Sequence, residues 1–159
     1  MLEIEIIAIG RLKESYLREA IAEYSKRLSA MCSFKITELE PFKLKDNPSP
    51  GEIAKALDKE AEEILKKAGN SKIIALCIEG KELSSEGFSD FIKEQKGKGV
   101  SKLCFVIGSS CGLSPKVKER AIFKLSVSKM TFPHQLFRVM LTEQIYRALS
   151  IEEGLKYHK

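Results

Sequence analysis

The chain has 159 residues, 43% of them hydrophobic and 31% charged, a composition typical of one globular domain spanning residues 1–159. No run reaches the roughly 18 apolar residues of a membrane span, and the amino-terminal segment lacks the basic start of a signal peptide, so we expect a cytoplasmic protein without a membrane partner. The charge of +5 resides in the last third, because residues 101–159 hold 10 basic and 4 acidic side chains against 17 and 18 in residues 1–100. This excess favours a polyanion such as RNA as partner, although an ordinary solvated surface would have the same composition.

The first half of the sequence alternates between strand and helix patterns. Residues 2–9 are rich in Ile and end at Gly10, which predicts a strand, and apolar residues at helical spacing predict a helix over 14–29. Residues 33–39 alternate as an exposed strand does, and a polar loop follows at 41–50. Ser49, Pro50 and Glu52 predict a helix start that continues to Gly69, with a buried face of Ile53, Leu57, Ala61, Ile64 and Leu65.

The second half continues the same alternation. Residues 73–78 and 103–107 are apolar at successive positions, as strands buried on both faces are. Gly80 is expected to turn the chain into a helix that Ser84 or Ser85 caps and that ends near residue 95. A short helix after Ser114, a strand over 122–127, a helix over 133–150 and a tail over 151–159 complete the chain. Strands and helices in strict alternation predict an α/β fold with a largely parallel sheet flanked by helices on both faces.

The helix over 133–150 is apolar on more than one face. Its apolar side chains include Leu136, Val139, Met140, Leu141 and Ile145. A helix of this kind needs burial on two sides, and few elements follow it in the chain. We therefore expect the same helix of a second subunit to cover it in a homodimer, while an internal helix of a single chain remains the alternative.

The cysteines and histidines argue against a metal site. Cys32, Cys77, Cys104 and Cys111 form no C-x-x-C pair, and His134 and His158 are the two histidines. This set lacks the spacing of zinc ligands, so we interpret the cysteines as small buried hydrophobes and expect no metal.

Three strand ends are candidates for a ligand site, because ligands of open α/β sheets gather at the carboxyl ends of the strands. They are residues 78–81, 107–112 and 126–133. The glycines at 108 and 112 lack the G-x-G-x-x-G spacing of a dinucleotide site, and their spacing alone favours ordinary turn glycines over a nucleotide site. The third segment is more specific. Its loop offers backbone N–H and C=O groups to an adenine edge, with Met130, Phe132 and Leu76 as apolar walls.

These segments resemble one family closely. The resemblance rests on residues 105–108 with Gly112, on L-S-V-S-K-M-T-F-P-H-Q at 125–135, on Arg138-Val139, on Glu143-Gln144 with Tyr146-Arg147-Ala148, and on the terminal Tyr157-His158-Lys159. Residues 7–13 fit as well, so the resemblance covers the full length. The chain is identified as a member of the RlmH family of SPOUT methyltransferases. Its one variation, G-S-S-C-G at 108–112, removes no motif position.

The resemblance implies a fold, a cofactor and a substrate. It implies a SPOUT-type α/β knot with a C-terminal trefoil knot, which general folding rules would not predict. It implies a homodimer that binds S-adenosyl-L-methionine and methylates N3 of a pseudouridine in 23S rRNA within the assembled 70S ribosome. The cofactor contacts carried over by motif position are Leu76, Gly108, Val127, Ser128, Lys129, Met130, Thr131 and Phe132.

Three residues are candidates for catalysis. His158 leads, because a base near the target has to accept or position the N3 proton. It lies with Tyr157 on a tail that could reach a partner's pocket or could be disordered. Arg138 is the third candidate, for a phosphate or base oxygen, with an interface salt bridge to Glu143 as the alternative. Candidate phosphate contacts are Arg11, Lys13, Lys129, Arg147 and Lys159.

Three other functions compete with this hypothesis. A SPOUT methyltransferase with another RNA target would share the fold, but the terminal Tyr157-His158-Lys159 argues against it. A non-catalytic ribosome-binding factor would share the basic last third but would not need the loop at 125–135. A nucleotide-dependent oxidoreductase would need the glycine pattern that this chain lacks.

Overall fold

A five-stranded parallel sheet forms the centre of the molecule. The computed structural model describes all residues, 1–159. Its strand order is β2-β1-β4-β3-β5, and every neighbouring pair is parallel. The strands are β1 (Glu3–Ile9), β2 (Ser33–Leu39), β3 (Lys72–Glu82), β4 (Lys102–Ile107) and β5 (Phe123–Ser126). All five carboxyl ends therefore meet at one edge of the sheet.

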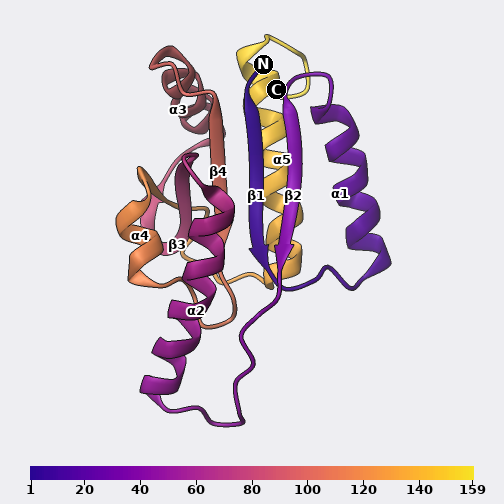
Figure 1. Cartoon of the computed structure of the whole chain (residues 1–159). Coiled ribbons are helices and arrows are strands. Elements are labelled where there is room, and N and C mark those ends of the chain that lie inside the picture. Colours follow the sequence, from indigo (N-terminus) through magenta and orange to yellow (C-terminus); the bar gives the residue numbers. More distant parts are fainter.

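Helices cover both faces of this sheet. They are α1 (Ser15–Leu28), α2 (Pro50–Ala68), α3 (Ser85–Gly97), α4 (Pro115–Arg120) and α5 (His134–Glu152). Figure 1 shows α2 and α4 on the front of the sheet and α5 behind β1 and β2. The predicted element order and α/β class are confirmed.

Two apolar cores hold these layers together. One packs α1, α3 and α5 against the sheet and includes Phe88, Phe105 and Ile145. The other packs α2 and α4 against the opposite face and includes Ile64, Val106 and Val117. Because β1 and β4 bury side chains on both faces, their runs of consecutive apolar residues are explained.

Local signals explain where the helices begin. Ser49 accepts a hydrogen bond from the Glu52 N–H and the Glu52 side chain caps the Ser49 N–H, so the predicted capping box is confirmed. Ser84 caps α3 by accepting from the Gly87 N–H at 2.9 Å. The loop between β5 and α5 ends at Pro133, whose fixed φ suits a helix start.

One local prediction was wrong and another was correct only in part. Gly80 does not turn the chain, because β3 continues to Glu82 with a register shift between Leu76 and Lys81. A Cβ on Gly80 would lie 2.7 Å from the Lys124 carbonyl oxygen, so glycine is needed there for close approach of β5. The buried face of α2 agrees with the prediction at Ala61 and Ile64, whereas the predicted Ile53, Leu57 and Leu65 are half-buried. The other buried residues of this helix are Ala56, Glu60 and Ala68.

Cysteine burial matches the prediction only in part. All four thiols are free, with Cys32 and Cys104 buried and Cys77 and Cys111 half-buried. Burial raises the pKa of the Cys104 thiol to about 12. None of the helices has both the length and the apolar composition needed to cross a membrane.

Candidate functional site

A pocket opens at the carboxyl ends of β3, β4 and β5. We call it the strand-end pocket; its volume is about 280 Å³, close to the lower end of the range for small-molecule sites. Leu76, Ile107, Leu113 and Leu125 form its apolar walls, and each is less than a tenth exposed. This is the edge where parallel sheets bind ligands.

The loop at 127–132 gives this pocket its polar groups. It has no regular secondary structure, and the Ser128 hydroxyl accepts from the Met130 N–H at 3.0 Å. The Ser128 carbonyl accepts from the Ser126 hydroxyl at 3.1 Å. The other backbone groups of residues 127–132 make no hydrogen bond within the chain. Free backbone donors and acceptors beside apolar walls suit the edge of a planar heterocycle such as adenine.

The opposite wall is the loop at 108–112. A Cβ on Gly108 would lie 2.3 Å from the Gly112 carbonyl oxygen, so no other residue fits without moving backbone. Ser109 and Gly112 pair as an isolated bridge, and Gly112 has a φ of 89°. The two glycines therefore allow the loop to make a tight turn, which agrees with their interpretation as turn glycines. This tight turn shapes the wall of the pocket.

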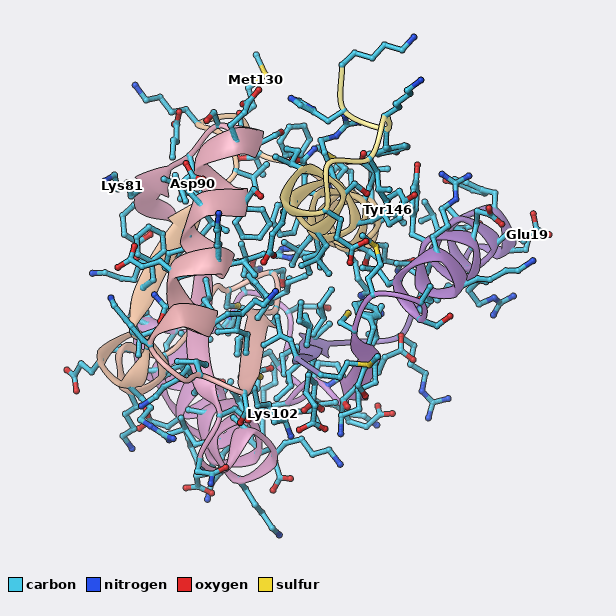
Figure 2. The ribbon with its side chains drawn as sticks, turned by 90° about the horizontal axis from the view of Figure 1, so that it is seen from above. Glu19, Lys81, Asp90, Lys102, Met130 and Tyr146 are labelled. Carbon is cyan, nitrogen blue, oxygen red and sulfur yellow. The ribbon has the colours of Figure 1, made fainter.

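Seven of the eight residues predicted to contact a cofactor line the strand-end pocket. They are Leu76, Gly108, Val127, Ser128, Met130, Thr131 and Phe132. Met130 lies at the rim, with its side chain 76% exposed at the periphery of the molecule (Figure 2). Lys129 does not line the pocket and is exposed to solvent.

Arg138 lies on the first turns of α5 and is buried. Its guanidinium pairs with Glu38 at 2.5 Å and donates to the Gly10 carbonyl at 3.2 Å. Glu38 also accepts from the Leu12 N–H at 2.7 Å. The partner of Arg138 is thus Glu38, whereas Glu143 pairs with Arg147 at 2.7 Å. The Arg138 network ties the β1–α1 loop and the end of β2 to the start of α5.

The carboxyl-terminal tail is ordered and docks on its own chain. Tyr157 donates to Glu143 at 3.0 Å and packs edge-on against Tyr146 at 4.7 Å between ring centroids. Figure 2 shows Tyr146 on the side of α5 that faces α1. Burial, followed by the hydrogen bonds with Tyr24 and Glu143, raises the pKa of Tyr157, so its phenol stays protonated and acts as a donor.

His158 has both ring nitrogens engaged. Nδ1 lies 3.1 Å from the Arg147 guanidinium and Nε2 lies 2.7 Å from Glu86. Because a guanidinium only donates, we assign the acceptor role to Nδ1 and the proton to Nε2. This bond to His158 lowers the pKa of the Glu86 carboxyl. The disordered-tail alternative is wrong for this structure.

The tail lies beside a second pocket rather than the first. We call this one the helix pocket; it has a volume of about 550 Å³ and lies between the start of α3 and the outer side of α5. Glu143, which holds Tyr157, lines it, and so do Ser84 and Ser85 beside Glu86. Leu125, Ser126 and Val127 line both pockets, so the two are neighbours. No residue after Phe137 lines the strand-end pocket.

The sequence relatives of this chain are methyltransferases. Residues 2–158 match the family described as "Predicted SPOUT methyltransferase". The chain belongs to the SPOUT methyltransferase family. It is 52% identical to "Ribosomal RNA large subunit methyltransferase H" of Carboxydothermus hydrogenoformans and 48% identical to the protein of that name from Streptococcus uberis, over 99% of this chain and 100% of each relative. Membership of the RlmH family, predicted from the motifs, is confirmed.

A solved methyltransferase structure has a similar fold. The tRNA (m1G37) methyltransferase of Aquifex aeolicus superimposes with a TM-score of 0.52 at 12% identity, over 99% of this chain and 73% of that one. At this identity the likeness concerns the fold alone. SPOUT methyltransferases take their methyl group from S-adenosylmethionine, and the strand-end pocket suits it because free backbone groups and apolar walls meet there.

Three residues that line the strand-end pocket or hold its wall were not singled out from the sequence, although Glu79 lies within the predicted segment 78–81. Glu79 and Lys118 form an ion pair at the rim of the strand-end pocket, and the Lys118 ammonium lowers the pKa of the Glu79 carboxyl. They lie 39 positions apart, so no local pattern joins them. Glu60 is buried on α2, four residues from Ala56 and from Ile64. A charged residue on the apolar stripe of a helix is the signal that could have found it.

Proposed function

We propose that this protein transfers a methyl group from S-adenosylmethionine to N3 of a pseudouridine in 23S rRNA. The observation that best supports this proposal is the strand-end pocket, where free backbone groups at 127–132 lie beside apolar walls. The relatives' name supplies the class of RNA. We place the reaction on the assembled 70S ribosome in the cytoplasm, and assign it to residues 1–159 as one methyltransferase domain. The knotted path of the carboxyl-terminal segment stays a prediction from the family.

The pocket residues hold the cofactor in this proposal. Leu76, Val127 and Phe132 enclose its adenine, while backbone groups of Ser128, Met130 and Thr131 are available to its polar edge. Bound there, the cofactor supplies a methyl group on a positively charged sulfur. The protein has to present the target nitrogen in line with that methyl group and exclude other orientations. Lys129, which points to solvent, is available to an RNA phosphate instead.

His158 and Tyr157 handle the N3 proton and the orientation of the base. The lone pair on His158 Nδ1 accepts a hydrogen bond from Arg147. To accept the N3 proton, Nδ1 has to give up this bond to Arg147 and form one to the substrate. Tyr157, a protonated phenol, donates a hydrogen bond. The His158 imidazole would accept the N3 proton when the methyl group is transferred to N3. Arg138 forms an ion pair with Glu38 and donates to the Gly10 carbonyl, so it serves as a positioning residue for the loop at 10–13.

The proposed homodimer brings a tail to a pocket. Within one chain the tail docks at the helix pocket, and the outer side of α5 leaves Leu136 40% exposed near half-buried Val139 and Met140. A second copy packed on these residues would cover them and bring its tail near the strand-end pocket. The active site then combines the cofactor loop of one protomer with the tail of the other.

A charge on this apolar surface is expected to separate the dimer. Leu136→Glu would bury a carboxylate against Val139 and Met140 of the partner, so sedimentation at micromolar concentration should show a monomer where the unsubstituted protein shows a dimer. Tyr16→Glu, which changes a 65% exposed residue on α1, is the matched control and should leave the dimer intact. A wild-type protein that sediments as a monomer would contradict the shared site.

A labelling experiment tests the function itself. Purified protein, radiolabelled S-adenosylmethionine and 70S ribosomes lacking the modification are expected to give labelled 23S rRNA, with the label at a pseudouridine N3 by nucleoside mass spectrometry. Fully modified ribosomes are the control and should accept no label. Label in transfer RNA alone would indicate a SPOUT methyltransferase with another target. Ribosome binding without any label would indicate a non-catalytic factor.

A further inference from the structure

Glu60 is a buried carboxylate that the proposed chemistry does not use. It lies in the middle of α2, is 6% exposed, and has Ala56, Ala61 and Ile64 as buried neighbours on the same helix. A carboxylate in such a position costs free energy unless hydrogen bonds compensate its lost hydration. Its bonding partners therefore indicate why a charge stands on the apolar stripe of this helix.

Each carboxylate oxygen of Glu60 holds a different segment of chain. The Ser109 hydroxyl donates to Oε1 at 3.0 Å, and the Phe42 N–H donates to Oε2 at 3.1 Å. Ser109 belongs to the loop that lines the strand-end pocket, 49 positions away in sequence. Phe42 lies in the connection between β2, which ends at Leu39, and α2, which begins at Pro50. One side chain thus joins the pocket loop to this connection.

Ser109 is the residue through which the pocket loop can be held. Its carbonyl accepts from the Gly112 N–H at 2.9 Å, and its hydroxyl also accepts from the Cys111 N–H at 3.4 Å. Gly108, directly before it, lies against the Gly112 carbonyl with no room for a Cβ. A displaced Ser109 would therefore shift both ends of the loop and change the shape of the pocket wall.

The same helix braces the far end of this loop. Asp58 accepts from the Ser114 hydroxyl at 3.4 Å and pairs with Lys116 at 3.6 Å. Ser114 in turn caps α4 by accepting from the Lys116 N–H. The loop from Gly108 to Ser114 is thus tied to α2 at two points. Of the two carboxylates that make these ties, Glu60 is buried and Asp58 is half exposed.

We propose that Glu60 is a positioning residue that fixes the Gly108–Gly112 wall of the strand-end pocket and joins it to the segment at Phe42. This proposal rests on the proposed cofactor site. Hydrogen bonds to a charged acceptor are stronger than neutral ones, which suits a tie that holds an irregular loop. The carboxylate acts through Ser109 and touches neither cofactor nor RNA.

The test compares Glu60→Ala, Ser109→Ala, the double variant and Glu60→Gln. The affinity for S-adenosylmethionine, measured by calorimetry without RNA, should fall about tenfold in Glu60→Ala, equivalent to roughly 1.4 kcal/mol. The double variant should bind no more weakly than Glu60→Ala, because the two side chains act through one bond. Glu60→Gln keeps an acceptor for Phe42 and offers its amide to the Ser109 oxygen, so it should restore most of the affinity.

Two controls separate positioning from loss of stability. Glu63→Ala changes an exposed residue on the same helix, and Ile64→Val removes one buried methyl group, which typically costs about 0.5–1.5 kcal/mol. Neither should weaken cofactor binding. In cofactor-free protein, amide hydrogen exchange at Ser109–Gly112 should quicken in Glu60→Ala and Ser109→Ala and stay unchanged in both controls.

The possible results decide separately on Glu60 and on the cofactor site. Unchanged loop exchange and cofactor affinity in Glu60→Ala and Ser109→Ala would overturn the positioning role. Additive losses in the double variant would overturn it as well. Should the unsubstituted protein fail to bind S-adenosylmethionine, the proposed function fails, while loop exchange still decides whether Glu60 holds the loop. If Glu60→Ala does not fold, Ser109→Ala and Glu60→Gln carry the same test.

Discussion

Gly108→Ala is expected to weaken S-adenosylmethionine binding by roughly 100-fold or more, about 2.7 kcal/mol. The added Cβ would lie 2.3 Å from the Gly112 carbonyl oxygen and 2.7 Å from its carbon, well inside contact distance. Both neighbours are backbone atoms, so the loop itself has to move. Because this loop is a wall of the strand-end pocket, one methyl group should deform the site as effectively as a larger side chain would.

The control for this experiment is another glycine of the same chain. Gly97, the last residue of α3, has no heavy atom within 4 Å of an added Cβ and no positive φ. Gly97→Ala should therefore bind the cofactor as the unsubstituted protein does. Calorimetry measures both affinities, and circular dichroism establishes that both variants are folded. Undiminished affinity in folded Gly108→Ala would show that the cofactor site lies elsewhere.

Removal of Tyr157, His158 and Lys159 is expected to lower turnover by roughly 100-fold or more, the usual effect of losing a general acid–base group. Cofactor affinity should change by less than about threefold, because no tail residue lines the strand-end pocket. The ion pair between Arg147 and Glu143, at 2.7 Å, does not depend on the tail and should keep this part of α5 in place. Single-turnover methylation and calorimetry measure the two quantities.

A neighbouring substitution serves as the control for the truncation. Glu153→Ala changes an exposed residue just after α5 whose side chain has no hydrogen-bond partner or ion pair, so turnover should be unaffected. His158→Ala alone should reproduce most of the loss if the imidazole accepts the N3 proton. Full turnover of the truncated protein would remove the tail from the mechanism, and an equal fall in cofactor affinity would make its role structural.

Element order was predictable because each element carries its own signal. The run of residues 103–107 is apolar at successive positions, and β4 is buried on both faces. Ser49 and Glu52 marked the start of α2 through a capping box whose partners are three residues apart. Gly80 was misread because its reason is not local. It makes room for the backbone of β5, about 45 residues away in the chain, and only packing creates that requirement.

The candidate site was predictable where it is a continuous segment. The loop at 127–132 is a single stretch, and all its residues but Lys129 line the pocket. Lys129 was included because motif position does not say which side chain turns outward. Arg138 could be named from the sequence, but its partners Glu38 and Gly10 lie 100 and 128 positions away, so its buried ion pair could not.

By itself the sequence determined the α/β class, the order of the elements, the family and the loop at 127–132 as a candidate site, since these follow from periodicity, capping and contiguous motifs. Only the tertiary structure decided which residues act together. It paired Glu79 with Lys118, placed His158 between Arg147 and Glu86, and joined Glu60 to Ser109. The physical reason is that these contacts form between segments that are distant along the chain. They arise because parallel strands end at one edge of the sheet and helices pack across its faces. The order of residues along the chain does not show which of these distant segments come into contact.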